Sequence, residues 1–97
     1  MAMIGKFTAA RGGFEGTIET FLTVLEVRIE PADPGPEAAP DFRIHRGAAE
    51  IGAAWERQTK AKRRYLAVVI DDPSLARPIE CRLVQAESHW KLMWSRN

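Results

Sequence analysis

Apolar and polar residues alternate with a period of two through most of the chain, which is the pattern of half-buried β-strands. The clearest example spans residues 78–85, where Ile79, Cys81 and Leu83 alternate with polar or charged residues. Residues 89–95 repeat the pattern, with two tryptophans and a leucine on the apolar face. Further segments that predict strands are 4–8, 14–20, 25–30, 42–44 and 65–70.

Residues 48–64 have a more ambiguous pattern. Ile51 and Trp55 lie four residues apart, as on one face of a helix, and the segment is rich in good helix formers. However, alternate residues from 51 to 55 are also apolar, and Gly52 would cost about 1 kcal/mol in a helix interior. We therefore predict a strand over residues 50–58.

Turn residues separate these segments. Gly12-Gly13 predicts a hairpin between the first two strands, and Glu87-Ser88 predicts another between the last two. Residues 31–41 hold four of the six prolines and no large apolar side chain, which predicts an exposed loop. About seven strands and no helix result. This total predicts a single all-β antiparallel domain over residues 1–97, either a sandwich or a small barrel, with OB-like and SH3-like barrels among the options.

Composition limits the class of protein. The 97 residues are 45% hydrophobic and 28% charged, which is a globular composition with room for one core. The single cysteine, Cys81, excludes an internal disulfide and fits a reducing compartment. The sequence shows no signal-peptide layout and no apolar run of membrane-spanning length. We therefore predict a cytoplasmic protein without membrane contact.

Charge is divided unevenly along a chain whose formal net charge is +1. Residues 1–42 have seven acids and three bases, whereas residues 43–97 have eleven bases and six acids. Bases are densest at a predicted hairpin turn, with Trp55 and Tyr65 near its ends. Basic side chains neutralise phosphates and aromatic rings stack on unpaired bases, so this hairpin predicts binding of single-stranded nucleic acid. The residues expected to make this contact are Arg57, Lys60, Lys62, Arg63, Arg64 and Tyr65.

Two alternatives compete with nucleic-acid binding. In the first, the basic hairpin is a solvated turn, with Trp55 in the core. In the second, the chain is a protein-binding module, such as an inhibitor or counter-defence factor of a mobile element, or a homodimer. Residues 65–70 are apolar on both faces, so Ala67 and Val69 need cover from a partner or a second copy. The acidic N-terminal half would add a surface for a basic target.

The sequence offers no constellation for catalysis or metal binding. Asp71 and Asp72 are adjacent carboxylates without a third acid close in sequence, and they predict a capped turn. His45, His89 and Cys81 lack the spacing of metal ligands. No serine lies in a nucleophile elbow, and Cys81 falls on an apolar face. We therefore expect a non-enzymatic protein that uses no metal and no cofactor.

Several short motifs occur in a distinctive order and spacing along nearly the whole chain. They are Ile4-Gly5, Phe7, Phe14-x-Gly16-x-Ile18, Ala39-Pro40-Asp41-Phe42-Arg43, Glu50-Ile51-Gly52-Ala53-Ala54-Trp55, Tyr65-Leu66, Asp71-Asp72-Pro73-Ser74 and Trp94-Ser95-Arg96. In this order they resemble an uncharacterised bacterial family, catalogued as domain of unknown function 736. The resemblance implies a small bacterial protein, often encoded on plasmids and other mobile elements, and it implies no activity. The chain departs from the family in its more basic hairpin and in the apolar residues Ala67 and Val69.

Overall fold

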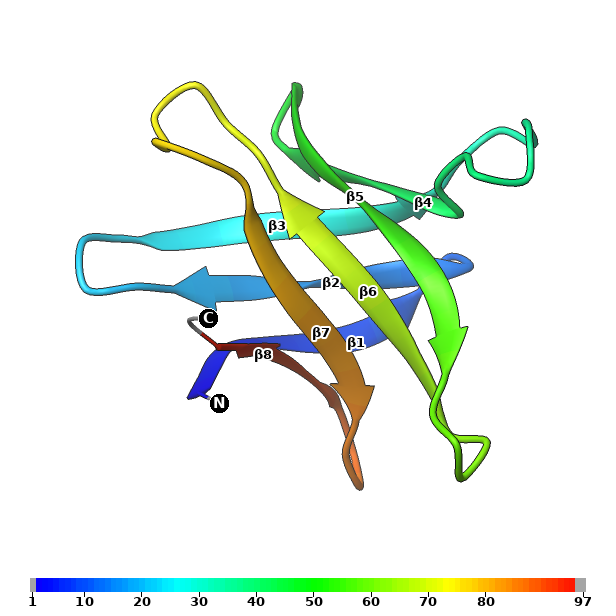
Figure 1. Cartoon of the computed structure of the whole chain (residues 1–97). Coiled ribbons are helices and arrows are strands. Elements are labelled where there is room, and N and C mark those ends of the chain that lie inside the picture. The colour runs from blue at the N-terminus through cyan, green and yellow to red at the C-terminus, as the bar shows by residue number, and fades with distance from the viewer. Residues whose placement is uncertain (1, 96–97) are drawn as a thin grey trace.

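Eight antiparallel strands, each paired with the next in sequence, close into a barrel when β8 pairs with β1 (Figure 1). The structure is a computed structural model that describes residues 2–95. The figure shows β1, β2 and β3 running across the view and β5, β6 and β7 crossing them at a steep angle. The strands are β1 (Ala2–Ala10), β2 (Gly13–Glu19), β3 (Val24–Pro31), β4 (Phe42–Arg46), β5 (Ala49–Gln58), β6 (Arg64–Ile70), β7 (Ile79–Gln85) and β8 (Trp90–Trp94).

The barrel confirms the all-β prediction and corrects its details. There are eight strands rather than the total of about seven, one for each of the eight segments that alternation indicates, because even the short strand β4 pairs with both β3 and β5. A single closed sheet agrees with the small-barrel alternative and excludes the sandwich. Sequential pairing all the way round is the topology of an up-and-down barrel, which differs from the smaller OB and SH3 alternatives.

The ambiguous segment forms a strand, as predicted, because its backbone pairs with β4 on one side and with β6 on the other. The register shifts by one residue where β4 meets β5, between Ile44 and His45. This bulge leaves Ile51 unpaired with β4, and Ile51 turns into the core together with Ile44. Gly52 follows directly, where an added Cβ would lie 2.2 Å from the carbonyl oxygen of Val69. The bulge and the glycine therefore let β5 bend over the barrel.

The core fills the interior with side chains from every strand. Leu83 and Leu92 are completely or almost completely buried, and Cys81 lies among them as a core thiol. One end of the barrel is filled by aromatic rings, since the Phe14 centroid lies 4.8 Å from that of Trp90 and 6.1 Å from that of Phe42. The two tryptophans of β8 pack against this core, in agreement with the alternation that predicted it.

Both predicted hairpins are present, and the turn between β7 and β8 is at Glu87-Ser88, as predicted, whereas the turn between β1 and β2 is shifted by one residue. Arg11 and Gly12, rather than Gly12-Gly13, are the central residues between β1 and β2, and both have positive φ, of 54° and 82°. Two positive φ angles in succession are the geometry of a type I′ turn, which matches the twist of the strands. Pro31 belongs to β3, opposite Phe42, and not to the exposed loop as predicted. A proline is tolerated at this position because it is the last residue of its strand.

Sequential antiparallel pairing divides the connections between the two ends of the barrel. The β2–β3, β4–β5 and β6–β7 connections lie at one end, and the other four lie at the opposite end. In Figure 1 the β2–β3 turn lies at the left of the view and the β5–β6 turn at the lower right. No helix occurs within residues 2–95, and hence none that is long and apolar enough to cross a membrane.

Candidate nucleic-acid interface

The turn between β5 and β6 projects from the barrel and is held by its own backbone. The amide of Thr59 donates to the carbonyl of Arg63 at 3.0 Å, and the amide of Lys62 donates back to the carbonyl of Thr59 at 2.9 Å. The Thr59 hydroxyl accepts from the amide of Arg63 at 3.2 Å. Because these contacts use the backbone and Thr59 alone, the charged side chains of the turn are not needed to shape it.

The cations of this turn differ in how their charge is balanced. Arg64 forms an ion pair with the Glu56 carboxylate, so its positive charge is largely compensated. Arg57 donates to the Glu56 carbonyl at 2.9 Å, which leaves its charge uncompensated. The tip consists of three exposed cations, Lys60, Lys62 and Arg63, and none of these has an ion-pair partner within residues 2–95. We call these three residues the basic tip.

Behind the basic tip, the register of four strands aligns further residues in a row across the outside of the barrel. Arg57 of β5 lies opposite Tyr65 of β6, Tyr65 lies opposite Val84 of β7, and Val84 lies opposite Lys91 of β8. All face outward, because the neighbouring residues Leu66, Leu83 and Leu92 face the core. Lys6 of β1 lies opposite Lys91 and continues the row.

Arg82 adds a further cation beside this row. It lies on the same outer face of β7 as Val84, and its guanidinium carbon is 4.9 Å from the centre of the Tyr65 ring. This cation–π contact holds a planar, positively charged group against the aromatic ring. We call Arg57, Tyr65, Arg82 and Lys91 the basic row.

Trp55 has a different position from the one expected. It faces outward, opposite Ala67, and is half-buried on the surface, so the placement of Trp55 in the core is wrong. Its indole N–H donates to the carbonyl of Ala38 at 3.0 Å, which ties the proline-rich loop to the outside of β5. Trp55 thus anchors that loop, and Tyr65 is the aromatic ring that lies within the basic row.

The two outward-facing apolar residues of β6 are partly covered by their neighbours. Ala67 lies between Trp55 and Arg82, and Val69 lies between Ala53 and Glu80. Both are half-buried on the outside of the barrel, while their inward neighbours fill the core. Neighbouring side chains of β5 and β7 therefore cover part of the apolar surface of Ala67 and Val69.

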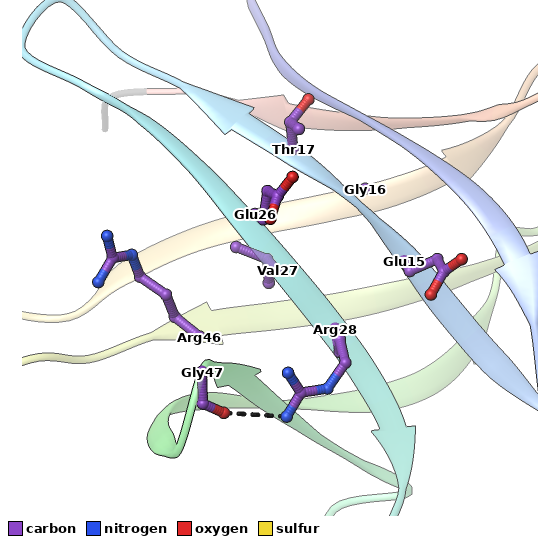
Figure 2. A pocket seen from close by; sticks show the side chains of 8 residues that line it. All are labelled: Glu15, Gly16, Thr17, Glu26, Val27, Arg28, Arg46 and Gly47. Atoms are coloured by element: carbon purple, nitrogen blue, oxygen red, sulfur yellow. Dashed lines mark hydrogen bonds between the residues drawn. The ribbon is translucent and has the colours of Figure 1, made fainter.

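Acidic side chains gather on a different part of the barrel. Glu15, Glu19, Glu26 and Glu30 face outward from β2 and β3, with Arg28 among them. An open groove of about 790 Å³ lies over these strands. Its lining includes Arg28, whose guanidinium donates to the carbonyl of Gly47 at 2.9 Å (Figure 2). Arg28 thus ties the β4–β5 turn to β3. The glutamates of β2 and β3 thus lie on other strands than Arg57, Tyr65, Arg82 and Lys91, which belong to β5–β8.

The remaining polar candidates have structural roles. Asp72 accepts from the amide of Ser74 at 2.9 Å and from its hydroxyl, which confirms the capped turn. Those hydrogen bonds, the hydroxyl first, lower the pKa of Asp72. Burial raises the pKa of the Cys81 thiol to about 11, so it is protonated at neutral pH and a poor nucleophile. Within residues 2–95, no three His, Cys, Asp or Glu side chains are arranged to hold a metal ion.

Sequence reasoning identified Arg57 and Tyr65 but missed Arg82, Lys91 and Lys6. Each of these three lies alone in its own strand, far from the basic hairpin in sequence. Alternation alone indicates that they face outward. Their alignment depends on the pairing of β6 with β7, β7 with β8 and β8 with β1, which local sequence does not specify.

Together these features define a small, closed, antiparallel β-barrel that has a basic outer surface on one side and an acidic surface on the other. The chain belongs to the family described as protein of unknown function (DUF736), whose model matches residues 3–97. Neither a curated protein nor a solved structure matches the chain significantly.

Proposed function

We propose that this chain is a non-enzymatic, cytoplasmic accessory protein of a bacterial mobile element that binds single-stranded nucleic acid with its basic row and basic tip. The observation that carries the proposal is the alignment of Arg57, Tyr65 and Lys91 across four paired strands, with Arg82 against the ring. Uncompensated cations beside an aromatic ring are the combination that single-strand-binding surfaces use.

The dimensions of the basic row suit a short stretch of nucleic-acid backbone. Neighbouring strands lie about 4.8 Å apart, so Arg57 and Lys91 are separated by about 14 Å across three strand spacings. Including the basic tip, six cations are within reach of one extended strand, namely Arg57, Lys60, Lys62, Arg63, Arg82 and Lys91. The convex outside of the barrel favours a flexible single strand over a rigid duplex, because only a flexible strand can follow the curvature.

A second candidate function is protein binding through the outside of β5 and β6. The observation that favours it is the half-buried apolar cluster of Ala53, Trp55, Ala67 and Val69, which lies next to the basic row. Such a cluster beside cations would suit an acidic protein partner that also has an apolar patch. This partner would be an inhibited target, for example one involved in host defence.

Fluorescence anisotropy of a labelled single-stranded oligonucleotide is the first test of the proposed function. We expect micromolar binding at low salt that weakens by roughly 50-fold between about 50 and about 200 mM salt, the effect of about four phosphate contacts. A duplex of the same sequence should bind more weakly. Absence of binding at the lowest salt would contradict the proposed function and favour the protein-binding candidate.

A further inference from the structure

The β2–β3 turn exposes large apolar side chains at the end of the barrel opposite the basic tip. Phe21 is fully exposed, Leu22 is 87% exposed, and Val24 and Met3 are also exposed. The Thr20 amide donates to the Thr23 carbonyl at 2.8 Å, and the Leu22 amide donates to the Thr20 hydroxyl at 3.3 Å. Since the threonines shape the turn, neither Phe21 nor Leu22 is required for its conformation.

A hollow lies directly beside this apolar turn. It has a volume of about 470 Å³ and lies between the start of β1 and the end of β2. Met3, Ile4 and Gly5 line it from β1, and Phe21 lines it from the β2–β3 turn. The volume is ample for a phenyl ring. A projecting phenyl group and a hollow that could receive one are therefore adjacent on the same surface.

We propose that this surface pairs with a second copy of the chain, so that Phe21 of each copy enters the hollow of the other. A projection and a matching hollow side by side are what a two-fold interface requires, because the same patch must be complementary to itself. The patch also has one cation, Lys6, and one anion, Glu19, so two copies can meet with opposite charges facing.

The charges of the β2–β3 hairpin argue against a membrane as the occupant. Residues 17–26 contain Glu19 and Glu26 and no Lys or Arg, so the hairpin would be repelled by an anionic lipid surface. A two-fold dimer instead buries Phe21 and Leu22 of both copies together. It leaves both basic rows exposed, and the inference does not depend on what the basic row binds.

Analytical ultracentrifugation over a wide concentration range tests this inference. We expect the mass of the full-length protein to rise from that of one chain toward that of two as concentration increases from low micromolar to several hundred micromolar. The double variant Phe21→Ser/Leu22→Ser should stay monomeric throughout that range. Because the threonines hold the turn, the circular-dichroism spectrum and the thermal unfolding of the double variant should match those of the wild type.

A matched control separates this surface from the other apolar surface of the barrel. Val69→Lys places a charge on the outside of β6 and should leave association unchanged. A wild type that is monomeric at the highest concentration would overturn the inference. It would also be overturned if Phe21→Ser/Leu22→Ser still dimerised, or if Val69→Lys dissociated the dimer. Lys6 is left unchanged in both variants, because it borders this surface and the basic row.

Discussion

Gly16→Ala should destabilise the barrel by about 3 kcal/mol or more, a large share of the total stability of a small domain. A Cβ at this position would lie 2.0 Å from the carbonyl oxygen of Lys6 and 2.7 Å from the Cα of Phe7. Both atoms belong to the backbone of β1, which β8 holds on its other side. Accommodating one methyl group therefore requires β1 to move and strains the closure of the barrel. Urea unfolding followed by tryptophan fluorescence measures the loss.

Gly35→Ala is the matched control for this prediction. Gly35 lies in the exposed loop between β3 and β4, where the new Cβ would meet only the side chain of Ala39, at 3.2 Å. We expect a change below about 1 kcal/mol, because the loop can adjust. Equal stability of the two variants would contradict the prediction, because it would show that the close contact between β1 and β2 does not require a glycine at position 16.

Reversing two charges of the basic row, Arg57→Glu together with Lys91→Glu, should weaken single-stranded DNA binding by roughly 100-fold. Each substitution removes one phosphate contact and introduces repulsion, so the salt dependence should also become shallower. Both residues lie on the outside of the barrel, Arg57 exposed and Lys91 half-buried, and Tyr65 and Val84 separate them, so the fold should tolerate the change. Anisotropy titrations at low salt measure the loss.

The control for this charge reversal is Arg46→Glu together with Arg77→Glu. These two exposed arginines lie in the β4–β5 and β6–β7 regions, at the end of the barrel away from the basic tip. The double variant has the same net charge as the double variant of the basic row. It should bind nearly as the wild type does, with a loss of less than about threefold. Equal losses in both variants would mean that binding follows overall charge and not the basic row.

Much of the fold could be predicted because each strand has its own local signal. Alternation in residues 78–85 and 89–95 reflects one buried and one exposed face, and β7 and β8 have those faces. Closure could not be predicted in the same way. The pairing of β8 with β1 joins the two ends of the sequence, and the choice between barrel and sandwich depends on that pairing.

The candidate site was predicted only where its residues are contiguous. A run of bases at 57–64 is visible in the sequence, and so is the tyrosine that follows it. By contrast, the ion pair that compensates Arg64 and the bond that holds Trp55 against Ala38 are tertiary contacts. For Phe21 and Leu22 the local signal is misleading. Their hydrophobicity alone would predict burial, but both are exposed in the β2–β3 turn.

The most direct test of the central claim is an amide NMR titration of the isotope-labelled protein with a short oligothymidine at low salt. We expect chemical-shift changes at Arg57, Tyr65, Arg82, Val84 and Lys91 and at the basic tip, with none at Glu15 or Glu26 on the acidic surface. Changes concentrated at the β2–β3 hairpin, or no change at saturating oligonucleotide, would contradict the assignment of nucleic-acid binding to the basic row.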